Sequence, residues 1–321
     1  MKKEEIIKKL QGCDSTVLSF PERGSWGSSQ YRGNCSGWIP AYFIWKYDAK
    51  KVAEIFAGSG TTYDVCKDMG VSYTGIDLNP IPTRPGIISQ NILDENIELP
   101  AGFYDADMVF LHPPYPSIHE VKYSNNMWKD TNNLSQYDIQ NMSWEKGMQA
   151  VNKSILRGYA AMQPGAYEVV LVGEIRSKGQ YRSMYQNLTL PGILHQTFVK
   201  LQHNCVSNGR VYGKSDFALT GHEMIAVIKK PSGYEIAYVV PKLIKKDIRE
   251  CKMATWSDLV MAAAREIRGE FKTEQIFDAL CHSEKAKTNN NVAAKIRQTL
   301  QLLSQKGLIS HVDKSTWLVA S

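Results

Sequence analysis

The run His112-Pro113-Pro114-Tyr115 joins side chains that could hold a flat ring bearing an amine. It follows the apolar stretch 106–111, which predicts a strand. Two consecutive prolines fix the backbone and remove two amide donors, so the carbonyl of residue 112 or 113 is held outward as a free acceptor. An exocyclic amine could donate to this carbonyl and to the His112 side chain while its ring stacks on Tyr115. The run therefore suits an extruded nucleobase, and a rigid loop after a strand is the alternative.

A glycine-rich turn at 56–62 separates a predicted strand at 51–56 from a predicted helix that Thr61 or Thr62 would cap. Asp77 closes the next predicted strand. No Gly-Lys-Ser/Thr follows the turn and the dinucleotide spacing is missing, so a nucleoside triphosphate is not expected. Glycines let a ligand approach the backbone, and a carboxylate can accept hydrogen bonds from ribose hydroxyls. The ordered pair indicates a nucleoside ligand without phosphates, and the alternative is an ordinary turn with a surface acid.

The elements that would position these motifs alternate between strand and helix. Strands are predicted at 71–77, 87–94, 106–111 and 167–173, and a helix is predicted through 151–162. This alternation predicts an α/β fold with a doubly wound, Rossmann-like sheet. Two stretches, 118–150 and 176–222, are polar and aromatic with little periodicity, so we expect them to be irregular insertions.

The last quarter of the chain has a different pattern. Helices are predicted at 256–267 (with Thr255 as cap), 273–281 and 292–305, and a hairpin at 308–312 and 315–319. Three helices and a terminal β-wing predict a winged helix-turn-helix, which gives two domains, 1–241 and 242–321. The second domain holds 14 of the 38 Lys and Arg residues and 9 of the 32 Asp and Glu residues. Five of the six net positive charges therefore lie there, as on a phosphate-binding surface.

The ordered motifs at 56–62, 75–77, 91–94 and 112–115 resemble those of the DNA amino-methyltransferases, which use S-adenosylmethionine. The resemblance spans roughly residues 26–230. It implies that the glycine-rich turn holds the methionine part of the cofactor, the acid after the second strand its ribose and the acid after the third strand its adenine. The implied cofactor-binding residues are Glu54, Phe56, Gly58, Gly60, Thr61, Asp77 and Asp94, and residues 30–40 look like an additional cofactor-binding element. The implied catalytic residues are His112, Pro113, Pro114 and Tyr115.

His112 departs from that family, whose tetrapeptide normally begins with Asp, Asn or Ser. A neutral imidazole nitrogen can still accept a hydrogen bond from an amine, and methyl transfer mainly requires that the amine be aligned with the methyl group. We therefore expect an active enzyme with adenine N6 as target and cytosine N4 as the alternative. Cytosine C5 is not expected, because it requires a cysteine nucleophile that typically follows a proline, and the chain has no Pro-Cys pair.

The polar run from 289 to 301, followed by Gly307-Leu308-Ile309, resembles the winged-helix DNA reader attached to some restriction endonucleases. In such readers the helix enters the major groove. The implied DNA-binding residues are Asn290, Asn291, Lys295, Arg297 and Gln298, and a solvated helix face is the alternative. Double-stranded DNA is the expected partner, read by the winged helix and the two insertions. A restriction-modification or mobile-element setting follows, in which a cognate restriction endonuclease would be a second partner.

Two rival functions stay open. An RNA base methyltransferase would use the same cofactor fold and proline tetrapeptide, and a DNA-binding regulator could keep the cofactor after losing activity through His112. The six cysteines are scattered without zinc-site spacing, so no metal is expected. No apolar run approaches the roughly 20 residues of a membrane span, so we expect a cytoplasmic protein.

Overall fold

A computed structural model describes residues 1–117, 123–130, 133–177, 180–203, 217–231, 238–239, 247–252 and 254–319. The chain divides into two compact units, Met1–Pro241 and Lys242–Ser321, which are described separately. Parts of the two predicted insertions, namely 118–122, 131–132, 178–179 and 204–216, lie outside the described residues.

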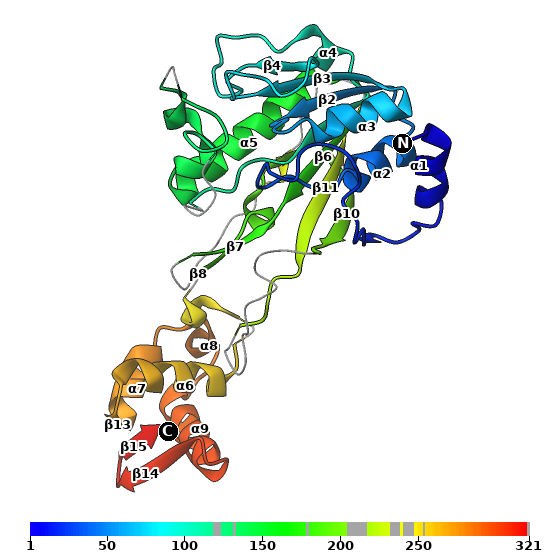
Figure 1. Ribbon diagram of the computed structural model, residues 1–321. Coiled ribbons are helices and arrows are strands. Elements are labelled where there is room, and N and C mark those ends of the chain that lie inside the picture. The colour runs from blue at the N-terminus through cyan, green and yellow to red at the C-terminus, as the bar shows by residue number, and fades with distance from the viewer. Residues whose placement is uncertain are drawn as a thin grey trace. The chain divides into compact units, whose positions relative to one another are not determined.

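The first unit is built on an eight-stranded sheet (Figure 1). In spatial order its strands are β1 (Val17–Leu18), β10 (Ile193–Leu201), β11 (His222–Lys229), β6 (Tyr167–Val172), β5 (Met108–Leu111), β2 (Lys51–Ile55), β3 (Ser72–Asp77) and β4 (Ile87–Ser89). The five strands from β6 to β4 are parallel, while β11 runs antiparallel to both β6 and β10. Parallel strands bring their carboxyl ends to one edge, where ligands of open α/β sheets bind.

Helices cover both faces of this sheet. One face carries α1 (Lys3–Leu10), α2 (Trp38–Lys46) and α3 (Thr61–Met69), and the other carries α4 (Ala101–Tyr104) and α5 (Trp144–Ala161). Alternate residues of one strand serve the two cores, as Val52 packs with α2 and α3 and Ala53 packs with α5. The predicted doubly wound α/β class is therefore confirmed.

The structure corrects three local predictions. The stretch 176–222 is not irregular, because it includes all of β10 together with β8 (Gln180–Ser183), β9 (Leu190–Pro191) and the end of β7 (Glu174–Ser177). The strand expected at 87–94 ends at Ser89, where Gln90 donates its N–H to the Asp77 carbonyl. Neither threonine caps α3, since its N-cap is Gly60 in the left-handed conformation.

The remaining short elements of the first unit lie outside the main sheet. They are η1 (Leu134–Tyr137), η2 (Ile139–Asn141), η3 (Tyr185–Asn187) and β12 (Tyr238–Val239). Strand β12 pairs with β9, and β7 pairs with β8 to form a separate hairpin. None of the helices in the described ranges combines the length and apolar composition that a bilayer crossing requires.

The second unit has a core of its own, and it confirms the predicted winged helix-turn-helix. Its elements are η5 (Ile248–Glu250), α6 (Trp256–Ile267), β13 (Glu270–Lys272), α7 (Thr273–Leu280), α8 (Glu284–Lys287), α9 (Val292–Gln305), β14 (Ile309–Asp313) and β15 (Thr316–Val319). Thr255 caps α6 as predicted, with its side chain accepting the Asp258 N–H. The wing has three strands in the order β13-β15-β14, because Phe271 of β13 pairs with Trp317.

Candidate cofactor and catalytic site

A cavity lies at the carboxyl ends of β2, β3 and β5. This edge of an open α/β sheet is where ligands bind. The predicted site residues that line it are Glu54, Phe56, Gly58, Thr61, Asp77, His112 and Pro114. Gly60, Asp94, Pro113 and Tyr115 are not part of its wall. Both halves of the predicted site, the glycine-rich turn and the start of the proline tetrapeptide, therefore face one space.

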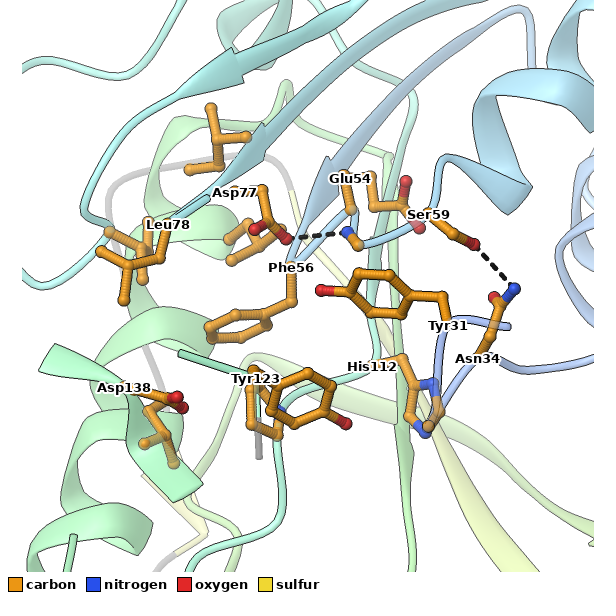
Figure 2. A pocket seen from close by; sticks show the side chains of 18 of the residues that line it. Tyr31, Asn34, Glu54, Phe56, Ser59, Asp77, Leu78, His112, Tyr123 and Asp138 are labelled. Carbon is orange, nitrogen blue, oxygen red and sulfur yellow. Dashed lines mark hydrogen bonds between the residues drawn. The ribbon is translucent and has the colours of Figure 1, made fainter. Parts of the chain in front are cut away.

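The glycine-rich turn is tied to the end of β3 through Asp77. The Gly58 N–H donates to Asp77 Oδ2 at 2.7 Å (Figure 2). The Asn79 N–H donates to Asp77 Oδ1 at 2.9 Å. Burial raises the pKa of Asp77, and these two hydrogen bonds oppose that rise. Each carboxylate oxygen has a second lone pair, so Asp77 can accept further hydrogen bonds from a ligand.

Aromatic side chains form much of the cavity wall. Phe56 follows β2 directly and is in the left-handed conformation, with φ of 67°, which is strained for a residue with a β-carbon. This turn directs its ring to the cavity beside those of Tyr31 and Tyr123, whose centroids are 5.9 Å apart (Figure 2). A Cβ on Gly58 would lie 3.2 Å from the Tyr31 ring, so the glycine allows the ring to cover the turn closely.

The segment before α2 is fastened to the glycine-rich turn by hydrogen bonds. Asn34 Nδ2 donates to Ser59 Oγ at 2.7 Å (Figure 2). Thr61 Oγ1 donates to Asn34 Oδ1 at 2.5 Å. Tyr31 and Asn34 both line the cavity. Sequence reasoning named the segment but neither of these side chains.

Glu54 lies beneath the turn with its side chain almost fully buried. Thr62 Oγ1 donates to its carboxylate at 2.5 Å, and the Tyr73 hydroxyl also donates to it. Burial raises the pKa of Glu54 to about 8, although both hydrogen bonds act in the opposite direction. Its contacts therefore hold α3 against β2 and β3, and its carboxylate is largely committed to protein partners.

Asp94 does not reach the cavity, which corrects the place given to it by the resemblance. Its Oδ1 accepts the Asn96 N–H at 3.0 Å within a surface turn. Because β4 is shorter than predicted, Gln90, Asn91 and Leu93 supply that part of the wall instead. Asn91 Oδ1 already accepts the Leu93 N–H, which leaves its side-chain NH₂ as the polar group for a ligand.

His112 is neutral at physiological pH, because burial lowers its pKa to about 4. Its Nε2 lies 3.3 Å from the Tyr115 hydroxyl. That hydroxyl donates to Glu223 Oε1 at 2.6 Å, and the Tyr115 ring packs against Gly173, where a Cβ would approach it to 2.5 Å. Tyr115 thus packs within the protein, so the expected stacking face is not presented to the cavity.

Two charged residues behind the tetrapeptide were missed by sequence reasoning. Lys200 of β10 and Glu223 of β11 face each other in register and form a buried ion pair. Burial alone would raise the pKa of Glu223. The Lys200 ammonium, His112 and the hydrogen bonds from Lys200 and Tyr115 outweigh burial and lower this pKa to about 2. No motif marks either residue, and Lys200 lay in a stretch predicted to be irregular.

In the second unit the predicted DNA-binding residues lie at the start of α9. Asn291 caps the helix by accepting the Ala294 N–H, and Lys295 Nζ donates to Gln298 Oε1 at 2.9 Å. Asn290, Arg297 and Gln298 are exposed. Arg297 also lines a groove that α7, α9 and the wing form, in which Trp317 Nε1 donates to Thr273 Oγ1. Asn291 therefore has a structural role, while the other four side chains face solvent wholly or in part.

Comparisons with known proteins complete this description. Residues 252–317 match the family described as the Dam-replacing HTH domain, DpnI_C, so the second unit is similar to the helix-turn-helix domains of that family. No curated protein sequence matches the chain. Throughout the described ranges, no group of three or more His, Cys, Asp or Glu side chains is arranged to hold a metal ion.

Two solved structures have a similar fold and low sequence identity to this chain. TrmN from Thermus thermophilus is 14% identical over 62% of this chain and 50% of its own, with a TM-score of 0.37. A SAM-dependent methyltransferase from Archaeoglobus fulgidus is 11% identical over 60% of this chain and 91% of its own, with a TM-score of 0.35. This chain thus spans half the length of TrmN. At such identities and TM-scores neither structure defines the function of this chain.

Proposed function

We propose that this protein is an S-adenosylmethionine-dependent DNA amino-methyltransferase that modifies adenine N6. One observation carries the proposal: the Asp77-bonded glycine-rich turn and His112 of the proline tetrapeptide line the same cavity. Residues 1–241 would form the catalytic domain, and residues 242–321 would be a DNA-binding domain. The helix-turn-helix match and the five net positive charges of the second unit support DNA as the substrate.

The cavity fits the cofactor by the chemistry of its walls. Asp77 has free lone pairs for the two ribose hydroxyls, and the Asn91 amide can donate to a ring nitrogen of adenine. The aromatic rings of Phe56, Tyr31 and Tyr123 attract a cation such as a sulfonium. When bound, S-adenosylmethionine supplies an activated methyl group, whose carbon–sulfur bond breaks with its electron pair left on sulfur.

The chain's own residues would hold the amine in place for this transfer. An unprotonated nitrogen of neutral His112 accepts one amine hydrogen, which directs the nitrogen lone pair away from the imidazole. A backbone carbonyl of the tetrapeptide accepts the other hydrogen and stabilises positive charge that develops on nitrogen. The surplus proton leaves to solvent after the new nitrogen–carbon bond has formed, so no strong base is needed.

Sequencing the DNA of a methylation-free host that expresses the protein tests the proposal, with a His112→Ala chain as the partner experiment. N6-methyladenine confined to one sequence motif, and absent with the variant, is the expected result. N4-methylcytosine would keep the enzyme class and change the base. Unmodified DNA from soluble protein that binds S-adenosylmethionine would overturn the proposal. Methylation of transfer RNA or cofactor binding without turnover would then identify the RNA enzyme or the regulator, respectively.

A further inference from the structure

The Lys200–Glu223 pair lies directly behind the catalytic tetrapeptide. Lys200 and Glu223 have side chains only 15% and 7% exposed, and Glu223 Oε1 accepts the Tyr115 hydroxyl at 2.6 Å. The same oxygen is 4.0 Å from His112 Nε2. A chain of polar contacts therefore runs from the ammonium on β10 through the carboxylate on β11 to the residue that faces the cavity.

The placement of protons along this chain follows from the number of donors. Glu223 is ionised because the Lys200 ammonium contacts it, and a carboxylate can only accept hydrogen bonds. The hydrogen between Tyr115 and Glu223 therefore belongs to Tyr115, whose only O–H is used in this bond. Any hydrogen between Tyr115 and His112 must then come from His112 Nε2.

Electrostatics favour the same arrangement. A protonated Nε2 directs its N–H dipole at the Glu223 carboxylate and the Tyr115 oxygen, whereas an unprotonated Nε2 would direct a lone pair at them. Since His112 carries one ring proton at neutral pH, its Nδ1 must then be unprotonated. Among the described residues Nδ1 has no hydrogen-bond partner, so its lone pair is available to a ligand in the cavity.

We infer that Lys200, Glu223 and Tyr115 are positioning residues that fix His112 in the Nε2–H tautomer, so that Nδ1 accepts the hydrogen of the target amine. This inference rests on the proposed function, and it explains how an imidazole can stand where a carboxylate or amide oxygen is usual. Without the fixed tautomer, part of the protein molecules would carry the proton on Nδ1 of His112. In those molecules an N–H group would face the N–H of the target amine and repel it.

The pair is a poor candidate for stability alone. Buried ion pairs often contribute nothing net over apolar residues of similar volume, because desolvation offsets their attraction. β10 and β11 are already joined by an eight-pair register. If the pair had only a structural role, its removal would not change the tautomer of His112. The tautomer therefore distinguishes the two roles experimentally.

Long-range ¹⁵N–¹H correlation spectra of histidine-labelled full-length protein test the inference directly. His112, one of seven histidines, is assigned with a His112→Asn chain. The wild-type protein should show a single Nε2–H pattern at neutral pH, and Lys200→Met/Glu223→Gln should show a mixture of both tautomers. Glu168→Gln, a buried carboxyl elsewhere on the sheet, should leave the pattern of His112 unchanged.

Wild-type His112 protonated on Nδ1, or averaged between tautomers, would overturn the inference even if the double variant fails to fold. An unaltered pattern in a folded double variant would overturn it as well. If the wild-type pattern is as expected while no DNA is methylated, the proposed function fails and the tautomer assignment stands. If the enzyme is active, the double variant should have a kcat about tenfold lower than that of the wild-type protein. This loss is smaller than the loss caused by removing a group that itself transfers a proton. The KM for the cofactor should not change.

Discussion

Gly58 and Asp77 are joined by a hydrogen bond from the Gly58 N–H to Asp77 Oδ2 at 2.7 Å. This bond connects the turn after β2 with the end of β3. The turn backbone would hold the methionine part of the cofactor, and the Asp77 carboxylate would hold its ribose. Because of the bond, these two groups move as one body. A change at Asp77 should therefore disturb both contacts at once.

Asp77→Asn should weaken S-adenosylmethionine binding by at least about tenfold, because an amide has one acceptor oxygen fewer and its NH₂ group would face the N–H of either Gly58 or Asn79. Isothermal titration calorimetry measures the change. Asp107→Asn is the matched control, since Asp107 accepts the Lys50 and Lys51 backbone N–H groups at the amino end of β2. Equal affinities for wild-type and Asp77→Asn protein would contradict the assigned role.

Protonation of His112 should make the first unit less stable in acid. Burial lowers its pKa to about 4, so between pH 6.5 and 4 the unfolded chain binds a proton that the folded chain does not. The free energy of unfolding should fall over this window by up to about 3 kcal/mol. Urea titrations at successive pH values should show the fall in wild-type protein and a smaller one in His112→Asn. Identical pH profiles for the two proteins would show that His112 is not the group responsible.

Glu168 of β6 makes the opposite contribution. Neither of its carboxyl oxygens has a hydrogen-bond partner among the residues that the structure describes, and burial under α5 raises its pKa well above the usual value. The unfolded chain ionises this group above pH 4.5 while the folded chain keeps it protonated, so stability is lost as pH rises. Glu168→Met should raise the free energy of unfolding at neutral pH by about 1–3 kcal/mol, because a buried unpaired polar group is removed.

Thermal denaturation at pH 5 and pH 8 measures this effect, which should be larger at pH 8. Glu98→Gln, on the exposed surface, should change stability by no more than about 0.5 kcal/mol at either pH. A less stable Glu168→Met protein would show that the carboxyl group is paired in solution.

The fold could be predicted from the pattern of apolar and polar residues along the chain. Some of the site residues could not be predicted from this pattern. Strands β2, β5 and β6 are short, mainly apolar runs bounded by turn residues, and β3 begins soon after the helix-ending Gly70, so their existence and order could be read directly. Strand β10 was missed because it is mostly exposed and its register shifts between Leu194 and Gln196, which breaks the alternation of apolar and polar residues.

The misplaced site residues have similar local causes. Asp94 was assigned by its distance from a strand that ends five residues earlier than predicted, so Asn91 takes its place on the wall. Lys200 and Glu223 are charged residues that only the pairing of β10 with β11 brings together. Sequence spacing cannot locate such a pair, because its two members belong to different strands and neither lies in a motif.

Arg297 should contribute to DNA affinity through phosphate. Arg297→Ala in the full-length chain should weaken binding to different duplexes by similar factors and reduce the slope of log K against log salt by about 0.9. Lys306→Ala removes the same charge beyond the other end of α9 and should have a smaller effect. Fluorescence anisotropy over a series of salt concentrations distinguishes the two variants. Equal losses from both would indicate attraction by overall charge, without a defined contact at the start of α9.

The sheet order also determines when the site can be completed during synthesis. A growing chain produces Gly58, Asp77 and His112 long before Lys200 and Glu223, and β11 must enter between β6 and β10. A nascent chain that has emerged only through β6 can thus form the cofactor half of the cavity. The wall behind His112 depends on long-range strand pairing, which forms slowly. A nascent chain on the ribosome can therefore bind its ligand before it becomes able to catalyse a reaction.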